Sequence, residues 1–220
     1  MTFSLAGRCA RTGMFGVAVT TSSIAVGSRC GFARAGVGAV LTQHRTDPRL
    51  GPIGVALLQA GKDAEATIRE MAAGTPERDW RQLAAIDAGG TTAFFHGAHI
   101  HSIHAGAQVK DCVAIGNILA NAGVPAAMAA AFARDPAAPL AERLVRGLEA
   151  GLTAGGERGA VRSASLLVMH QHSFPYVDLR VDEADAPIAA LRVLWEAYAP
   201  QADDYVARAV DPGSFGPSQT

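Results

Sequence analysis

The residue of this 220-residue sequence best suited to chemistry is the threonine at position 2. Methionine aminopeptidase accepts small second residues, so removal of Met1 is expected to leave Thr2 at the N-terminus. A terminal threonine carries a hydroxyl and an α-amine on neighbouring carbons, and an amine with a pKa of about 8 takes up the hydroxyl proton near neutral pH. Thr2 would then supply both nucleophile and general base. A strand expected from Phe3 onward would hold it on a rigid element.

Further polar residues stand where strands are expected to end. Ser22 and Ser23 follow an apolar strand at 15–21, where their hydroxyls either bond the terminal amine or lie in solvent. Asn117 follows Gly116 at another strand end. Its amide suits an oxyanion, although asparagine also favours turns for backbone reasons. We therefore predict Thr2, Ser22, Ser23 and Asn117 as the catalytic group.

Candidate substrate-binding residues come from two other segments. His44 and Arg45 follow Thr42-Gln43 on a loop expected to border the cleft, where both suit an anionic substrate unless they are simply solvent-exposed. Arg162 suits a substrate carboxylate by bidentate hydrogen bonding, with a structural ion pair as the alternative, and Ser163 lies beside it.

Four histidines, His96, His99, His101 and His104, fall within nine residues. In an extended segment His99 and His101 would face the same side, as zinc ligands do. No neighbouring Cys, Asp or Glu completes a ligand set. We predict no metal, and we assign His99 and His101 to a loop that lines the substrate pocket, with a polar surface loop as the alternative.

Composition excludes several classes of function. Nineteen basic and twenty acidic residues give a net charge of -1, which leaves no basic excess for nucleic acid. No signal peptide and no apolar run of about 20 residues is present, which predicts no membrane partner. The three cysteines, Cys9, Cys30 and Cys112, are widely separated and predict reduced thiols in the cytoplasm. No glycine-rich phosphate motif implies a nucleotide cofactor, and no GxSxG indicates an α/β-hydrolase.

The spacing of apolar residues predicts the secondary structure that positions these groups. Strands are expected at 3–9, 15–21, 25–31, 36–42, 80–87, 91–95, 113–115, 163–169 and 176–181. Helices are expected at 53–60, 64–73, 125–133, 139–151, 187–198 and about 203–210, with Asp63 as an N-cap. Clustered strands separated by helix pairs favour antiparallel sheets covered by helices. The predicted class is α+β, a four-layer αββα sandwich, in one domain over 1–211 with a polar tail at 212–220.

Ordered motifs along most of the chain carry a resemblance to a known family. They are Met1-Thr2-Phe3-Ser4, Phe32 to Val40 with Thr42-Gln43, Asp47 to Pro52, Arg81-Gln82 with Asp87, Gly116-Asn117, Gly155 to Gly159, Arg162-Ser163-Ala164 and Tyr176 to Asp182. On these the sequence is identified as similar to the bacterial and archaeal family called domain of unknown function 1028. That family resembles the N-terminal-nucleophile (Ntn) hydrolases, which include proteasome β-subunits and penicillin acylases.

The resemblance implies an αββα fold with Thr2 in the nucleophile position. The histidine segment departs from the family, which more often has a Cys and a Trp-Ala-Gly-His stretch there; only Ala105-Gly106 is retained. Substrate specificity is therefore not carried over from relatives.

The sequence thus predicts hydrolysis of a C–N bond (amide, lactam or ureido) in a small metabolite, with an anionic substrate as one option and no cofactor. The alternatives are a non-catalytic small-molecule-binding protein and a metal-dependent enzyme built on the histidines. The sheet edges and the Ala- and Gly-rich helices predict a homo-oligomer, with a dimer favoured.

Overall fold

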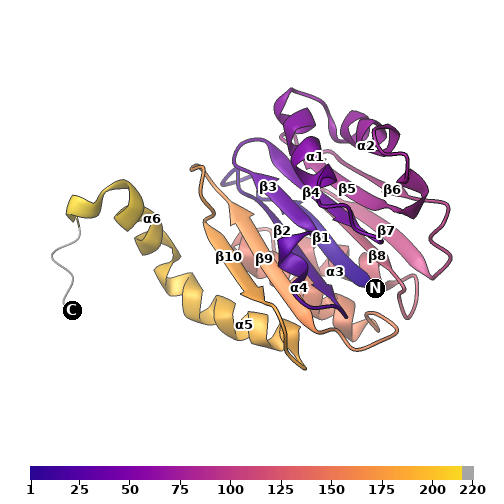
Figure 1. The fold of residues 1–220 in the computed structure, drawn as a ribbon. Helices are drawn as coiled ribbons and strands as arrows, with labels where there is room; N and C mark the ends of the chain where they lie inside the picture. The colour runs from indigo at the N-terminus through magenta and orange to yellow at the C-terminus, as the bar shows by residue number, and fades with distance from the viewer. Residues whose placement is uncertain (215–220) are drawn as a thin grey trace.

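The chain folds into two antiparallel sheets, seen in a computed structural model that describes residues 1–214. The larger sheet has the order β10-β9-β2-β1-β8-β7 and the smaller one the order β3-β4-β5-β6 (Figure 1). The strands are β1 Thr2–Arg8, β2 Phe15–Thr21, β3 Gly31–Arg34, β4 Gly38–Gln43, β5 Gln82–Asp87, β6 Thr92–His96, β7 His104–Val109, β8 Cys112–Asn117, β9 Ser163–Met169 and β10 Val177–Val181.

Helices cover the outer face of each sheet. They are α1 Leu50–Gln59, α2 Ala64–Ala73, α3 Val124–Ala133, α4 Leu140–Thr153, α5 Pro187–Tyr198 and α6 Ala202–Val210. The helices α1 and α2 pack on the smaller sheet, and α3, α4 and α5 pack on the larger one, while α6 leads away from the body toward the C-terminus (Figure 1). The predicted four-layer αββα sandwich is confirmed. Within residues 1–214, no helix combines the length and apolar character needed to cross a membrane.

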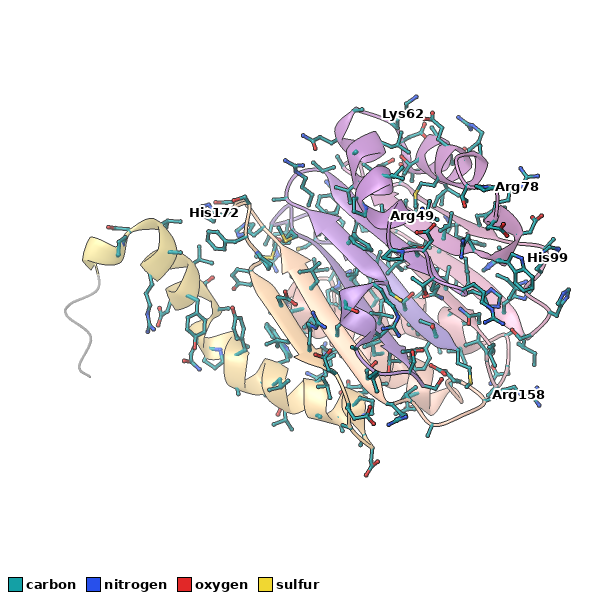
Figure 2. The ribbon with its side chains drawn as sticks, in the orientation of Figure 1. Arg49, Lys62, Arg78, His99, Arg158 and His172 are labelled. Atoms are coloured by element: carbon teal, nitrogen blue, oxygen red, sulfur yellow. The ribbon has the colours of Figure 1, made fainter. Side chains whose placement is uncertain are left out.

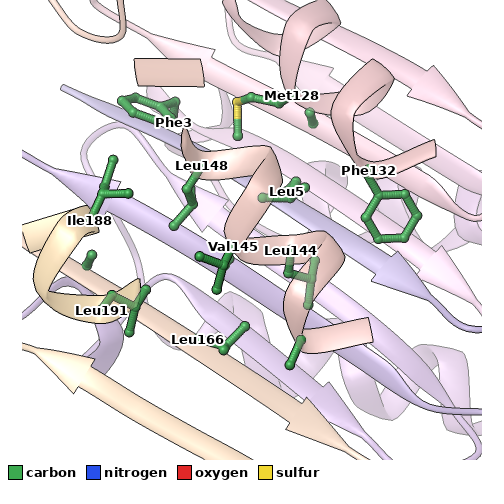
Figure 3. Packing of buried hydrophobic residues seen from close by; sticks show 14 of the residues in the cluster. Phe3, Leu5, Met128, Phe132, Leu144, Val145, Leu148, Leu166, Ile188 and Leu191 are labelled. Carbon is green, nitrogen blue, oxygen red and sulfur yellow. The ribbon is translucent and has the colours of Figure 1, made fainter. Parts of the chain in front are cut away.

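Side chains of β1 alternate between two buried layers. Phe3 and Leu5 point toward α3 and α4, where they meet Met128 and Leu148 (Figure 3). Ala6 points the other way, into the apolar layer between the sheets. A strand buried on both faces has almost no freedom to move. The residue at its head, Thr2, therefore stands on a rigid support.

Two helix glycines bring α4 close to that strand. A Cβ atom at Gly147 would lie 2.5 Å from Leu5 Cδ1, and one at Gly151 would lie 3.0 Å from Phe3 Cε2. Contacts this short exclude a larger side chain unless the neighbour shifts. The helix α4 thus packs directly against the back of β1.

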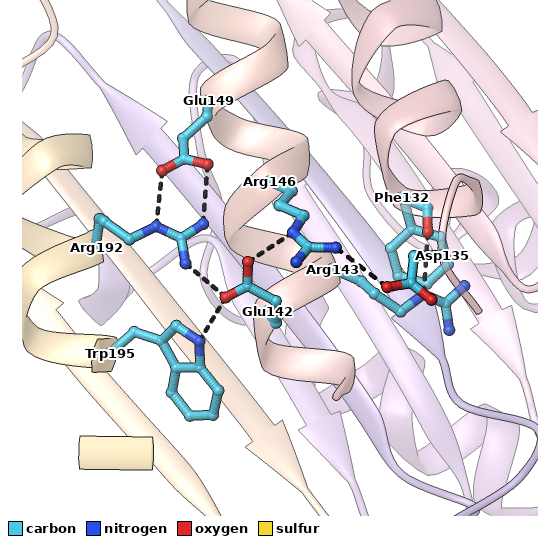
Figure 4. A network of polar contacts seen from close by, with 8 residues as sticks. All are labelled: Phe132, Asp135, Glu142, Arg143, Arg146, Glu149, Arg192 and Trp195. Atoms are coloured by element: carbon cyan, nitrogen blue, oxygen red, sulfur yellow. Dashed lines mark hydrogen bonds and ion pairs between the residues drawn. The ribbon is translucent and has the colours of Figure 1, made fainter. Parts of the chain in front are cut away.

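An ion-pair network joins α5 to α4 on the outer side of the larger sheet (Figure 4). Arg192 donates to both carboxylate oxygens of Glu149, at 2.8 and 2.9 Å, and to Glu142 at 2.5 Å. Trp195 Nε1 and Arg146 Nε also donate to Glu142, at 2.8 and 2.6 Å. Burial alone would raise the pKa of Glu142, but the hydrogen bonds from Arg192 and Trp195 outweigh it, so that its pKa lies below the ordinary value.

The elements match the predicted ones with three exceptions, one of which is that strand β3 lies between the strands predicted at 25–31 and 36–42. Helix α2, helix α5 and strand β9 have the predicted bounds, and Asp63 caps α2 by accepting from Ala66 N at 2.7 Å. The predicted strand at 25–31 is wrong: Ala25 adopts a left-handed conformation and a 3-10 turn follows at Val26–Ser28. Strand β7 was not predicted. Of the predicted polar tail, 212–214 form a 3-10 turn, and the rest lies outside the described residues.

Candidate functional site

One end of the space between the sheets is closed by polar side chains. We call this set the polar end layer; its members come from eight strands, and they are Thr2, Thr21, Gln43, Gln82, His96, His104, Asn117 and Ser163. Strand register aligns them: Thr2 pairs with Asn117 and Asn117 with His104, while Thr21 pairs with Ser163. In the smaller sheet Gln82 pairs with both Gln43 and His96. The edge of the sandwich at which Thr2 lies is therefore lined by polar side chains from both sheets.

Hydrogen bonds cross this layer from one sheet to the other. Ser4 Oγ donates to Gln43 Oε1 at 2.7 Å, and Gln43 Nε2 donates to Gln82 Oε1 at 2.6 Å. Asn117 Nδ2 donates to the same Gln82 oxygen at 2.8 Å. Gln82 Nε2 in turn donates to the carbonyl of Gly116 at 2.8 Å. All these side chains are fully buried, and the bonds tie β1 and β8 to the opposite sheet beside Thr2.

Thr2 lies at the head of β1 and is only 6% exposed. Its hydroxyl oxygen is 3.2 Å from the hydroxyl oxygen of Thr21, and both hydroxyls donate to the carbonyl oxygen of Met1. Thr2 also borders a cavity of about 360 Å³ that is lined by Met1, Thr2, Thr21, Ser23, Arg29, Cys30, His44, Arg45, Thr46 and Ile118. The predicted nucleophile is thus both rigidly held and adjacent to open space.

A buried carboxyl group, Glu157, faces the same end of the molecule. The loop that carries Glu157 runs along the residues after β8. Arg158 N donates to the carbonyl of Ile118 at 3.0 Å, and the backbones of Glu157 and Leu119 form an isolated antiparallel β-bridge. Glu157 is 7% exposed, and neither carboxylate oxygen has a hydrogen-bond partner in the ordinary range. Burial raises the pKa of Glu157 to about 7, against smaller opposing effects of the N-terminal amine and of Ser22.

The N-terminal amine and Glu157 influence each other. Burial lowers the pKa of the Met1 amine below its ordinary value, and the nearby Glu157 carboxyl works in the opposite direction. Sequence reasoning did not select Glu157, although it stands within the family motif Gly155 to Gly159. The available signal was an acidic residue in a short glycine-rich stretch between α4 and β9.

The loop with His44 and Arg45 forms one wall of the cavity. Both residues are left-handed, with φ of 55° and 47°, a conformation that costs about 1–2 kcal/mol for each non-glycine residue. His44 Nδ1 lies 2.8 Å from the carbonyl of Trp80, and Arg81 donates to the carbonyl of Arg45. Burial lowers the pKa of His44, which favours its neutral form. Trp80 and Arg81 thus hold the strained loop of His44 and Arg45 in place at the cavity.

Ser23 and Arg29 also line the cavity. Arg29 donates through Nη2 to Ser23 Oγ at 2.6 Å and through Nη1 to the carbonyls of Ile24 and Ala25, at 2.9 and 2.8 Å. Arg29 was not among the residues predicted from the sequence. Its position at the cavity comes from a local turn whose geometry the sequence did not indicate.

The predicted residues at 162 and 163 have structural partners. Arg162 forms an exposed ion pair with Glu183, which is the arrangement given above as the alternative to substrate binding. Ser163 Oγ donates to the carbonyl of Ser23 at 2.7 Å and accepts from Val26 N at 3.1 Å. Neither residue lines the cavity, and Ser163 instead braces the turn that carries Arg29.

The histidines separate into two places. His96 Nδ1 is 2.8 Å from Gln82 Nε2, its Nε2 is buried without a partner, and burial lowers its pKa to about 4. His99 packs on Trp80 with ring centroids 4.7 Å apart, and His101 lies beside it; neither lines the cavity. In the described part of the chain, no three His, Cys, Asp or Glu side chains are grouped as metal ligands. His99 and Arg158 mark the side of the molecule on which the N-terminus lies, away from His172 (Figures 1 and 2).

Comparisons with known proteins identify the family of the chain. The family model described as "Family of unknown function (DUF1028)" matches residues 2–191. The crystal structure of protein SPO2555 from Silicibacter pomeroyi, itself described by that family model, is 30% identical with a TM-score of 0.83, over 90% of this chain and 89% of that one. Anbu (ancestral beta-subunit) from Yersinia bercovieri is 14% identical with a TM-score of 0.38, covering 92% of this chain and 97% of that chain, which is too distant to carry an argument. No curated protein matches the chain.

Proposed function

The chain belongs to the DUF1028 family, and we propose that it is an amidohydrolase whose nucleophile is the hydroxyl of Thr2, freed by removal of Met1. The bond cleaved is the C–N bond of a small amide, lactam or ureido compound. The observation that carries this proposal is the position of the Thr2 hydroxyl, at the rigid head of β1 and on the wall of a cavity of about 360 Å³. A cavity of this size is at the small end of the range for ligand sites.

The α-amine of Thr2 serves as the general base. Cleavage of the Met1–Thr2 peptide bond converts the backbone nitrogen of Thr2 into this amine. The base and the nucleophile then belong to the same residue. A partly buried amine holds its proton less tightly, as the lowered pKa of the Met1 amine illustrates. A neutral amine at working pH takes up the hydroxyl proton as Thr2 Oγ1 attacks the carbonyl carbon.

The remaining steps follow from that attack. The C–N bond breaks, the leaving nitrogen takes the proton from the α-ammonium group, and an ester remains on Thr2. Water, deprotonated by the same amine, attacks the ester carbonyl and releases the acid. The buried Glu157 carboxyl interacts electrostatically with the amine of Met1, and it is expected to act on the amine of Thr2 in the same sense.

The hydroxyl of Thr21 is the side-chain donor best placed to stabilise an oxyanion at this site. It lies 3.2 Å from Thr2 Oγ1 and donates to a carbonyl oxygen, that of Met1. Asn117, the donor predicted from the sequence, points its amide nitrogen at Gln82 instead. We therefore propose that Thr21 assists the oxyanion and that Asn117 fixes the polar end layer.

The test combines two mass measurements. Intact mass reveals whether Met1 is removed, and peptide mapping after treatment with a β-lactone locates the acylated residue. We expect complete removal of Met1 and one adduct on Thr2. Thr2→Ala should abolish labelling, Thr2→Ser should retain it, and Thr153→Ala, an exposed hydroxyl on α4, should leave it unchanged. Retention of Met1, or an adduct elsewhere, would refute the proposal.

A further inference from the structure

We infer that Arg29 and Arg45 form a carboxylate-binding subsite, and that the substrate is an acylated or ureido compound bearing one free carboxylate. This inference rests on the proposed function only in placing the reacting bond at Thr2. The subsite itself is defined by the charges, the donors and the shape of the cavity wall.

The cavity lining includes two arginines and no acidic side chain. The arginines are Arg29 and Arg45, and His44 lines the cavity with them. In the described chain neither arginine forms an ion pair, whereas other arginines, such as Arg162 and Arg192, do. Two unpaired guanidinium groups on one small cavity create a potential that attracts an anion.

Arg29 is fixed before any ligand arrives. Three of its five N–H donors are engaged, two by the carbonyls of Ile24 and Ala25 and one by Ser23 Oγ, all of them uncharged acceptors. Its charge is thus held in position but not neutralised. The two N–H donors that remain match the two parallel hydrogen bonds that a carboxylate accepts from arginine.

Arg45 reaches the cavity because its backbone is held in a strained conformation. His44 and Arg45 are consecutive left-handed residues, and such strain persists only where neighbouring contacts maintain it. Arg81 provides one such contact by donating to the Arg45 carbonyl. Arg45 also lies near enough to the N-terminal amine to lower the pKa of that amine. The Arg45 guanidinium lies over the Trp80 ring, 5.9 Å from its centroid, and the residue lines the cavity with its charge unpaired, where it can bind an anionic group.

The volume of the cavity limits the size of the substrate that bears this carboxylate. A volume of about 360 Å³ holds a small molecule whose carbonyl lies at Thr2 and whose carboxylate lies against the arginines. N-acyl and N-carbamoyl amino acids of low mass have this arrangement.

The first experiment measures labelling of Thr2 by two β-lactones that differ only in a free carboxylate or its methyl ester. We expect the carboxylate probe to label at least tenfold faster, since charge-assisted hydrogen bonds contribute at that level. Arg29→Gln and Arg45→Gln should each remove most of this preference, read as the ratio of the two labelling rates within one variant. Arg158→Gln is the matched control, because this exposed arginine lies at the same end of the molecule outside the cavity wall.

A second experiment separates the subsite from the nucleophile. Calorimetry on Thr2→Ala should detect binding of N-acetylglycine and none of N-acetylglycinamide, with binding lost in the Arg45→Gln background. Arg45 is exposed, so that variant is expected to fold normally. Equal labelling by both probes, with no preference in calorimetry, overturns the subsite and leaves the proposed function standing. If Thr2 is not labelled but N-acetylglycine still binds, the proposed function is overturned and the subsite stands. Tighter binding of methyl phosphate than of N-acetylglycine overturns the carboxylate assignment.

Discussion

The hydroxyl oxygens of Thr2 and Thr21 lie 3.2 Å apart at the open end of the β1–β2 hairpin. Thr20, the neighbour of Thr21, faces the other way and donates to the carbonyl of Ser163 at 2.8 Å. Adjacent threonines on one strand thus have separate tasks. One hydroxyl belongs to the candidate site, and the other holds β2 to β9.

Replacing each hydroxyl should separate chemistry from stability. Thr21→Val is expected to slow labelling of Thr2 about tenfold or more, because one oxyanion donor contributes at least that much. Thr20→Val is expected to lower the free energy of unfolding by about 1 kcal/mol, the contribution of one buried hydrogen bond, with labelling unchanged. Labelling rates and urea titrations of both variants check this pair. Normal labelling in Thr21→Val would remove Thr21 from the mechanism.

The Glu157 carboxyl should shift the pH dependence of the reaction. Burial lowers the pKa of the Met1 amine in the structure and the Glu157 carboxyl opposes this, so Glu157→Gln is expected to lower the pKa of the Thr2 amine that takes its place. Since the amine acts as a base only when neutral, the acid limb of the rate profile is expected to move to lower pH. Labelling rates measured between pH 5 and pH 9 would show it. An unmoved limb would mean that Glu157 does not act on the Thr2 amine.

The Glu157 carboxyl should also make stability fall as pH rises, whereas a carboxyl in a salt bridge makes stability rise with pH. Its pKa rises from 4.5 to about 7 on folding, so the folded state keeps a proton that the unfolded state releases. Stability therefore falls as pH rises from 4.5 to about 7, and Glu157→Gln is free of this loss. Thermal unfolding at several pH values should show the advantage of the variant growing across this window. Parallel curves for the two proteins would contradict this prediction.

The α4–α5 network offers a prediction remote from the site. Arg192→Gln should lower stability at pH 7 by about 1–3 kcal/mol, because Glu142 and Glu149 lose a half-buried partner that donates charge-assisted hydrogen bonds. The pKa of Glu142 is lowered on folding, so its stabilisation is present above the unfolded value of 4.5 and is lost as pH falls through the folded value. Denaturant titrations at pH 7 and pH 3 should show the difference shrinking in acid, with Thr2 labelling unaffected.

Gly97 is expected to tolerate no side chain. A Cβ atom there would lie 2.3 Å from the carbonyl oxygen of Asp79, a backbone atom that cannot move alone. Gly97→Ala should cost about 1–3 kcal/mol of stability. It should also displace the segment whose Trp80 and Arg81 hold the strained loop, and so weaken the preference for an anionic probe. Wild-type stability and preference in the variant would contradict both expectations.

The spacing of apolar residues predicted most of the fold, because it follows the two-residue period of a strand or the 3.6-residue period of a helix in most elements. The strand predicted at 25–31 failed because its apolar residues fold into a turn whose carbonyls Arg29 binds. Strand β7 escaped because its sequence, HAGAQV, has a single β-branched residue, and its pairing with β8 makes it a strand.

Four residues proposed from the sequence, Thr2, Ser23, His44 and Arg45, line the cavity. Thr2 needs no partner to be recognised as a candidate. Glu157 and Arg29 became visible only in the fold, because the first depends on burial and the second on an uncompensated charge. His99 and His101 show the reverse, since four histidines close in sequence lie in two separate places.

The polar end layer carries a consequence for how the chain pairs its strands. Side chains alternate along a strand, so a slip of one residue would carry a hydroxyl or amide of the layer to a helix-covered face and leave it unpaired. Every one of the eight contributing strands is subject to the same constraint. The groups that lie beside the candidate site thereby disfavour alternative pairings, and a chain that folds in the wrong register would lose both stability and the arrangement of that site.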